Sequence, residues 1–231
     1  MITINYLGHS SFKITNNNTK LIIDPFDPKV ANLKWTTQEA DIVLVSHSHL
    51  DHSYIKGIKG FENARLIAGK VGEKQFLVYG AGEYEVNGVQ IMGISSYHDN
   101  KKGAERGENT IFIIHIDDFV IAHLGDLGHD LTDKQYEEVG NANILMIPVG
   151  GFYTIDHNIA ETIVANVQPN IVIPMHFKDG RDGDIGKNLD NLDKFLSSVS
   201  KENIISDEKL KLKSVTSLDQ DKTLVWVKAK S

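Results

Sequence analysis

The 231-residue chain contains no cysteine, which excludes disulfide bonds and thiolate metal sites. Any metal ion would therefore have to be held by histidine and carboxylate side chains. The lack of cysteine also fits a reducing compartment. The first residues, MITINYLGHSSF, lack the basic segment followed by an apolar segment that marks a secretory signal, so we expect a cytoplasmic protein.

An excess of positive charge is missing too. Lysine and arginine number 24 against 31 aspartate and glutamate residues, which gives a formal net charge of −7. Dedicated nucleic-acid binders usually carry a basic domain or stripe, so the charge argues against a nucleic-acid partner. No apolar stretch approaches the roughly 18 residues of a membrane span, and we expect no membrane partner.

The sequence also lacks a low-complexity linker and a short repeat, and we expect residues 1–231 to form a single domain. Short apolar segments bounded by turn residues predict strands. The predicted strands are residues 2–7, 20–23, 41–45, 64–68, 75–79, 89–97, 110–116, 119–124, 143–148, 170–174, 209–215 and 223–228. The predicted helices are residues 131–139, 159–167 and 189–199, and residues 28–40 are expected to form a loop.

Two of these helices carry a candidate cap, Thr132 for the first and Asp156 for the second. Strands come first in each half of the chain, and strand–helix units follow. This order predicts two sheets packed together with helices outside them, an α/β (α+β) architecture.

Histidine is concentrated in a few short segments, above all in VLVSHSHLDHSY, residues 43–54. His47, His49, Asp51 and His52 follow the apolar run 42–45 directly. In an extended segment residues two apart face the same way, so His47 and His49 can point at one metal ion. Asp51 and His52 can turn toward a second point nearby. Imidazole and carboxylate ligands together suit zinc, manganese or iron.

Other predicted strands also run into a histidine or an aspartate. His98 follows the strand 89–97, His123 and Asp126 follow the run 120–122, and His176 follows the strand 170–174. If the ends of these strands converge, the side chains meet at one edge of the sheets, where α/β proteins usually place their chemistry.

The segment His47-x-His49-x-Asp51-His52 resembles the HxHxDH signature of the metallo-β-lactamase fold. The later segments follow in the order of that family, and the likeness extends from Gly8 to His176. These later segments are His98, Gly125-Asp126 and Pro174-Met175-His176. Within the superfamily the chain looks most like the compact hydrolases related to L-ascorbate-6-phosphate lactonase. The resemblance implies a four-layer αβ/βα sandwich with a dinuclear metal site.

Carried over residue by residue, the resemblance implies that His47, His49 and His98 hold one metal ion. Asp51, His52 and His176 would hold the other, and Asp126 would bridge them. His123 competes with His98 for the first metal ion. If His98 is the ligand, His123 is expected to face the substrate in a catalytic role or to be a hydrogen-bonded histidine beside the site. The metal ions are expected to be zinc or manganese, with iron less favoured.

Two early residues, His9 and Asp24, match positions typical of the family, and each is expected to support the metal ligands. The simpler interpretation is a packed histidine for His9 and a turn at Asp24-Pro25. Cations near His98 and His176 are candidates for binding a phosphate or carboxylate of the substrate, although such runs also form solvated loops. These candidates are Lys101, Arg106 and Lys178, with Lys102 and Arg181 beside them.

These observations predict a metal-dependent hydrolase that cleaves a small anionic substrate, a lactone or a phosphoester, with a hydroxide held between two metal ions and oriented by Asp51. The alternative is a nuclease or phosphodiesterase of the same fold. A redox di-iron protein is less favoured, because that branch replaces the second signature histidine, here His49, by glutamate. A non-enzymatic binding protein is less favoured because no ligand is missing. The resemblance also allows a homo-oligomer.

Overall fold

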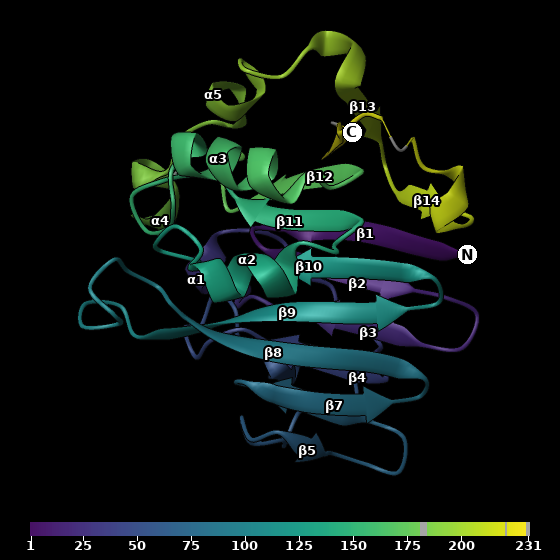
Figure 1. Ribbon diagram of the computed structural model, residues 1–231. Helices are drawn as coiled ribbons and strands as arrows, with labels where there is room; N and C mark the ends of the chain where they lie inside the picture. Colours follow the sequence, from purple (N-terminus) through teal and green to yellow (C-terminus); the bar gives the residue numbers. More distant parts are fainter. Residues whose placement is uncertain (181–183, 220, 230–231) are drawn as a thin grey trace.

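Two mixed β-sheets organise the chain in a computed structural model that describes residues 1–180, 184–219 and 221–229 (Figure 1). The strands of the first sheet are β1 (Ile2–Gly8), β2 (Ser11–Thr15), β3 (Lys20–Ile23), β4 (Ile42–Val45), β5 (Gly69–Lys70), β6 (Phe76–Tyr79) and β14 (Leu210–Leu212). They lie in the spatial order β14-β1-β2-β3-β4-β6-β5. Within this sheet β3, β4 and β6 run parallel, so their carboxyl ends point to the same edge.

The second sheet has the same mixed character. Its strands are β7 (Gly82–Val86), β8 (Val89–Tyr97), β9 (Glu108–Ile116), β10 (Phe119–His123), β11 (Ile144–Pro148), β12 (Ile171–Met175), β13 (Ile204–Asp207) and β15 (Leu224–Lys228). They lie in the order β13-β15-β12-β11-β10-β9-β8-β7. The neighbours β10, β11 and β12 are parallel, so residues that follow β10 and β12 leave the sheet at one edge.

The main core lies between the two sheets, and alternating residues of single strands contribute to different cores. In β4, Ile42 and Leu44 point into the core between the sheets, whereas Val43 and Val45 point into a cluster on the outer face. All four side chains are buried. The continuous apolar run before His47 is therefore a strand that is covered on both faces.

The two outer faces are covered differently. The helices are α1 (Pro28–Ala31), α2 (Asp133–Val139), α3 (His157–Val167), α4 (Asp184–Asn188) and α5 (Leu192–Leu196), with short 3₁₀ turns η1 (Ile55–Gly57), η2 (Lys201–Asn203) and η3 (Val215–Ser217). Figure 1 shows α2 and α3 over the second sheet, where Val139 and Ile163 of these helices and Phe195 of α5 pack on its strands. The first sheet is covered by η1 and irregular chain, including Phe61. The expected sandwich is confirmed, but one outer layer is mostly irregular.

The predicted helix caps are confirmed. Thr132 and Gln135 form a capping box at the start of α2, with the Gln135 backbone N–H donating to the Thr132 hydroxyl at 3.3 Å. The Asp156 carboxylate accepts from the Ile159 backbone N–H at 3.0 Å at the start of α3. None of the helices in the described ranges is long and apolar enough to cross a membrane.

Several predicted elements are wrong or differ in length. The predicted helix 189–199 is only α5, and the expected loop 28–40 begins with α1, which Asp27 caps. The strand predicted at 209–215 is β14 alone, followed by η3. Patterns in these segments are too short to fix an element, because one or two apolar contacts decide its length.

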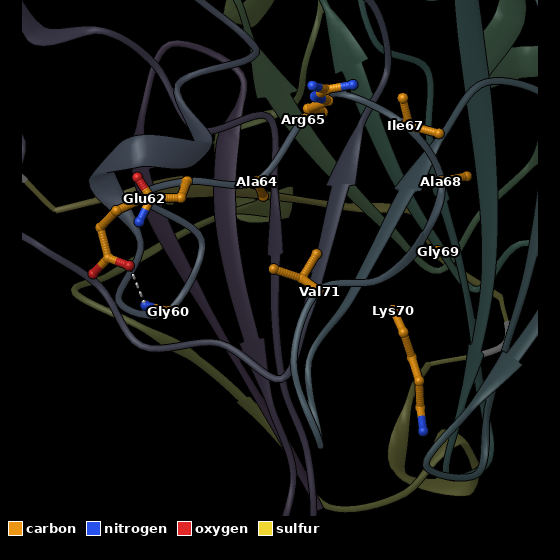
Figure 2. A pocket seen from close by; sticks show the side chains of 10 residues that line it. Gly60, Glu62, Ala64, Arg65, Ile67, Ala68, Gly69, Lys70 and Val71 are labelled. Atoms are coloured by element: carbon orange, nitrogen blue, oxygen red, sulfur yellow. Dashed lines mark hydrogen bonds between the residues drawn. The ribbon is translucent and has the colours of Figure 1, made fainter.

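The predicted strand 64–68 is also wrong, because this segment is irregular chain before the edge strand β5. Together with its neighbours it lines a surface pocket of about 500 Å³, shown in Figure 2. Leu66 packs against the outer cluster, whereas Ile67 is exposed. The pocket is lined by residues 60, 62–65 and 67–71 and contains none of the expected site residues.

Candidate metal centre

Histidines and carboxylates from six separate strand ends meet at one edge of the two sheets. His9 follows β1, Asp24 follows β3, and the segment 47–52 follows β4 in the first sheet. His98, Asp126 and His176 follow β8, β10 and β12 of the second sheet. The convergence expected from the sequence therefore follows from the face-to-face packing of the sheets.

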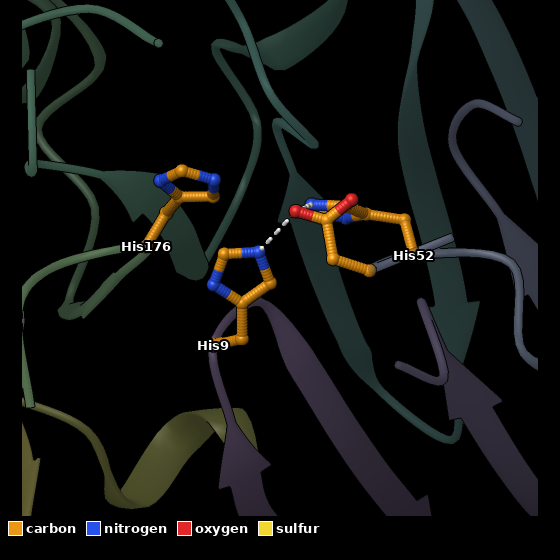
Figure 3. Close-up of side chains that lie close together, drawn as sticks. His9, His52 and His176 are labelled. Carbon is orange, nitrogen blue, oxygen red and sulfur yellow. Dashed lines mark hydrogen bonds and ion pairs between the residues drawn. The ribbon is translucent and has the colours of Figure 1, made fainter. Parts of the chain in front are cut away.

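The gathered side chains form three overlapping groups, one of which, Asp24, His47 and His52, shares its histidines with the other two. The ligand nitrogens of His47, His49 and His98 lie within 4.8 Å of one another. The same limit holds for the ligand atoms of His9, Asp51, His52 and His176, and Figure 3 shows the three histidines of this group facing one another. These are the two sets that the resemblance implies, with His9 added to the second.

Asp126 lies between the two groups and is buried. Its Oδ2 is 3.1 Å from Nε2 of His98 in one group. In the other group the same oxygen is 3.1 Å from Nε2 of both His52 and His176. One carboxylate thus faces both groups, which is the position expected for a bridging ligand.

A chain of hydrogen bonds from Asp24 orients two of the histidines. The Asp24 carboxylate accepts from the Ser46 hydroxyl at 2.6 Å and pairs with Nδ1 of His52 at 3.0 Å. Because an ionised carboxylate only accepts, His52 must donate its Nδ1–H. Because the Ser46 hydroxyl donates its only proton to Asp24, Nδ1 of His47, 2.9 Å away, must donate to the Ser46 oxygen. Both histidines then turn Nε2 toward the centre, where this nitrogen could bind a metal ion once it carries no proton.

The orphaned atoms at the centre fit a metal ion. Nε2 of His47, Nε2 of His52 and Oδ1 of Asp126 are buried and have no hydrogen-bond partner among the described residues. The contact of His52 with Asp126 is short, but it does not have hydrogen-bond geometry. Buried polar atoms without partners are costly in a protein interior, and bound cations would satisfy these three.

The electrostatics of the buried groups favour the same ligand. Burial lowers the pKa of His47 well below its usual value, so this ring is neutral and able to bind a metal. Burial acts to raise the pKa of Asp126, but His176 and His52 outweigh it and hold the pKa well below its usual range. Burial opposes a charge on His52 as well, yet Asp126 and Asp51 raise the pKa of His52. A bound cation would have to replace that proton.

His9 contacts the second group through Asp51. Its Nε2 lies 3.1 Å from Oδ2 of Asp51, so the ring donates to the carboxylate (Figure 3). Burial, followed by the neighbouring His176, lowers the pKa of His9 to about 3. His9, Asp24 and His176 all have positive φ values, of 57°, 46° and 54°. Such backbone is uncommon for residues other than glycine and often marks functional sites.

The structure separates His98 from its competitor His123. His98 belongs to the first group, whereas His123 is turned away and has both ring nitrogens engaged. Its Nε2 donates to the Ser10 carbonyl at 2.9 Å, and its Nδ1 accepts from the Gly125 backbone N–H at 3.1 Å. The catalytic role expected for His123 does not fit this geometry, because no ring nitrogen is left to meet a substrate. His123 instead joins the turn between β1 and β2 to the segment after β10.

A pocket of about 300 Å³ opens onto the two groups. It is lined by His49, Asp51, His98, Arg106, Asp126, Tyr153, His176 and Ile185. Of the expected substrate-binding cations, Arg106 lines this pocket. Lys101 is paired with Glu105 outside it, and Lys178 lies on an isolated bridge to Asn191. Arg181 falls outside the described residues.

Four residues of the site are missing from the sequence predictions. Ser46 links Asp24 to His47, and Tyr153 and Ile185 line the pocket. The Asn109 side chain accepts from the Asp126 backbone N–H at 2.9 Å and donates to the Leu124 carbonyl, which fixes the segment that carries Asp126. Only Tyr153 had a signal in the sequence, because it follows Gly150-Gly151 in a loop after a buried strand.

The chain is similar in sequence to known proteins. Residues 3–176 match the family model described as the beta-lactamase superfamily domain. A UPF0173 metal-dependent hydrolase from Lawsonia intracellularis is 30% identical, over 76% of this chain and 83% of the relative. One from Pyrococcus horikoshii is 28% identical, over 77% of this chain and 85% of the relative.

A solved structure is similar to this chain over almost its whole length. It is that of a Thermotoga maritima protein assigned to the metallo-β-lactamase superfamily as a zinc-dependent hydrolase. That protein is 27% identical to this chain and superimposes with a TM-score of 0.71, covering 99% of this chain and all (100%) of the other.

Proposed function

The chain belongs to the β-lactamase superfamily as one of the UPF0173 metal-dependent hydrolases, and from this premise we propose that it hydrolyses a small anionic lactone or phosphoester with two divalent metal ions. The observation that carries the proposal is the pair of ligand groups with Asp126 facing both. A single group would support one metal ion, whereas two groups that share a carboxylate fit a dinuclear centre.

His47, His49 and His98 would hold one ion, and Asp51, His52 and His176 the other, with Asp126 between them. We propose zinc or manganese, since the ligands are imidazoles and carboxylates without thiolates. The Thermotoga maritima relative, assigned as zinc-dependent, supports zinc. When bound, the ions would lower the pKa of a water molecule toward about 7 and polarise the oxygen of the group under attack.

The protein's own contribution to the reaction centres on Asp51. This carboxylate lines the pocket and is mostly buried, and the His9 ring donates to one of its oxygens. Its other oxygen would bind the metal ion together with His52 and His176, and from there the carboxylate would orient the attacking water and accept its proton. The water oxygen then forms the new bond to the carbonyl carbon or phosphorus atom as the bond from that atom to the ester oxygen breaks, and the proton taken up by Asp51 passes to that ester oxygen.

The pocket supports a small molecule as the partner. Its volume of about 300 Å³ is roughly ten times the share of one water molecule in the liquid. The net charge of −7 remains an argument against a nucleic-acid substrate. We keep the cytoplasm as the proposed location, because the chain has no cysteine.

The test compares initial hydrolysis rates of the metal-loaded protein on a lactone and on a phosphodiester. Asp126→Asn is expected to lower kcat/KM by more than about a hundredfold on the preferred substrate, since losing even a partner of a metal ligand costs 10- to 100-fold. Asp193→Asn, which removes the same charge at an exposed residue of α5, is the matched control and should behave like the wild type.

The two substrates separate the alternatives. A faster Asp126-dependent rate on the lactone supports the proposal as a lactonase, and a faster rate on the phosphodiester moves the substrate toward nucleotides. Equal rates for Asp126→Asn and the wild type would overturn the assignment of the site.

A further inference from the structure

The loop 98–107, between β8 and β9, is held in one conformation by a single buried carboxylate. Oδ1 of Asp99 accepts from the backbone N–H groups of Lys101 and Gly103 at 2.8 and 2.9 Å. Oδ2 accepts from those of Glu105 and Arg106 at 3.0 and 2.7 Å. Charge-assisted hydrogen bonds of this kind are stronger than neutral ones, so four of them fix the path of the loop.

The loop is also tied to the metal centre at its base. The His98 backbone N–H donates to the Gly107 carbonyl at 3.0 Å, and the Gly107 N–H donates to the Gly103 carbonyl at 3.0 Å. His98 is one of the proposed ligands, and Arg106 is the last side chain before the loop rejoins β9. Asp99 therefore sets the position of Arg106 relative to the centre.

The side chain of Arg106 is directed over Tyr153 at the pocket. Its guanidinium carbon lies 5.9 Å from the centre of the Tyr153 ring, and both residues line the pocket. Tyr153 is held in turn, because its hydroxyl accepts from the Asn188 side chain at 3.2 Å and its ring centre is 6.4 Å from that of His176. A cation over an aromatic face is stabilised by the ring without using its N–H donors.

Arg106 differs in this respect from the lysine of the same loop. Lys101 is 61% exposed and its ammonium group pairs with Glu105 at 2.5 Å. Arg106 is 31% exposed, and its contact with Glu105 is 4.0 Å, too long for a hydrogen bond. Arg106 lines the pocket, and its planar fork of donors matches two oxygens of a carboxylate or phosphate.

We propose that Arg106 and Tyr153 form a specificity clamp that binds an anionic group of the substrate, a phosphate or a carboxylate, beside the bond that is cleaved, and that Asp99 is the positioning residue of this clamp. The inference rests on the proposed hydrolase function for the identity of the substrate, but the binding of an anion by the clamp can be measured without turnover.

The direct test is a calorimetric titration of the metal-loaded protein with inorganic phosphate and, separately, with acetate. Arg106→Gln is expected to raise the Kd of the preferred anion by at least about tenfold, the effect of losing hydrogen bonds to a charged group. Arg106→Lys should recover only part of this affinity, because an ammonium group lacks the planar fork. Tyr153→Leu should raise the Kd by about two- to fivefold.

Asp99→Asn tests the positioning role. The amide offers one acceptor oxygen and turns an NH₂ group toward two of the four N–H donors, so the loop should loosen and the Kd should rise as in Arg106→Gln. In the double variant Asp99→Asn/Arg106→Gln the effects should not add, because both act through the same guanidinium. Lys134→Gln, which removes a positive charge at an exposed residue of α2, is the matched control.

Metal content, measured on every variant, separates the two hypotheses. Weaker anion binding at wild-type metal content supports the clamp, even if no ester is hydrolysed, and the hydrolase proposal would then fail alone. An unchanged Kd in both Arg106→Gln and Arg106→Lys would overturn the clamp whatever the turnover. An Asp99→Asn protein that binds the anion like the wild type, or that weakens it only by losing metal, would overturn the role of Asp99.

Discussion

At the scale of single residues, the role of each histidine depends on the partner of its second nitrogen. His47 and His52 give Nδ1–H to Ser46 and Asp24, which leaves Nε2 for the centre. His123 donates Nε2–H to the Ser10 carbonyl and accepts at Nδ1, so neither ring nitrogen is left to bind a metal ion. Identical side chains are thus a proposed metal ligand in one place and a structural bridge in another.

Asp24→Asn tests the chain of hydrogen bonds that orients the ligands. The amide group would face the Ser46 hydroxyl or His52 with a donor where an acceptor is needed, so both rings lose their orientation. We expect the affinity for zinc to fall by about 10- to 100-fold while the fold is retained. Competition with a chelating dye measures it, with the exposed Asp193→Asn as control. An unchanged Kd would show that the ligands are oriented without Asp24.

His123→Gln tests the structural role by pH. Burial lowers the pKa of His123 below its ordinary 6.5. The unfolded state therefore binds more protons, and the stability from His123 is complete above about pH 6.5 and is lost as the pH falls. In chelator, the wild type should lose more stability than His123→Gln between pH 7 and 5.5, by up to about 1.4 kcal/mol per pH unit. Denaturant unfolding measures the free energy of unfolding of both proteins. A difference between them that stays the same at every pH would contradict the prediction.

At the scale of elements, the strand ends place the ligands, and close backbone contacts fix those ends. The Val149 backbone N–H, just after β11, donates to the Met175 carbonyl at 3.0 Å, and the His176 N–H donates to the His9 carbonyl at 2.9 Å. The segment after β11 therefore packs against the end of β12, directly before His176. Gly150 is at this contact, and a Cβ there would lie 2.0 Å from the His176 carbonyl oxygen.

Gly150→Ala should displace His176, because the clash is with backbone that no side-chain rotation can relieve. We expect a loss of about 1–3 kcal/mol in the free energy of unfolding, typical of overpacking, and weaker metal binding. Gly72→Ala is the control, since a Cβ there meets only the end of the Gln75 side chain, at 3.1 Å. Wild-type stability and metal affinity in Gly150→Ala would show that this approach of the two segments is not needed.

At the scale of the whole molecule, the centre joins the two sheets across the main core. His9 and the segment 47–52 come from the first sheet, and His98, Asp126 and His176 from the second. A metal ion held by both would bind the folded state only, since the unfolded chain separates these residues. Metal binding and the packing of the sheets are therefore linked in free energy.

Removal of metal should consequently lower the melting temperature. At a free metal concentration 100 times the Kd, binding adds about 2.7 kcal/mol, or roughly 5–10 °C for a chain of this size. Thermal unfolding with zinc or manganese, against a chelator, measures the shift. Asp126→Asn should lose most of it and Asp193→Asn should keep it. A shift that survives in Asp126→Asn would place the metal elsewhere.

The sequence alone determined the features that depend on neighbours along the chain. The apolar run 42–45 predicted a strand buried on both faces, and the spacing of His47, His49, Asp51 and His52 predicted ligands at its end. Thr132 and Asp156 marked two helix starts, because a cap acts within one turn. The resemblance to a known family then ordered the remaining ligands.

Only the tertiary structure decided which distant residues meet. Tyr153 beside Arg106, Asn109 beneath Asp126 and the distinction between His98 and His123 depend on strand order and on which face of a sheet a side chain leaves. The segment 64–68 has the composition of a strand but finds no place in the first sheet. The physical reason is that local patterns record which residues are buried, whereas the packing of two sheets fixes what they are buried against.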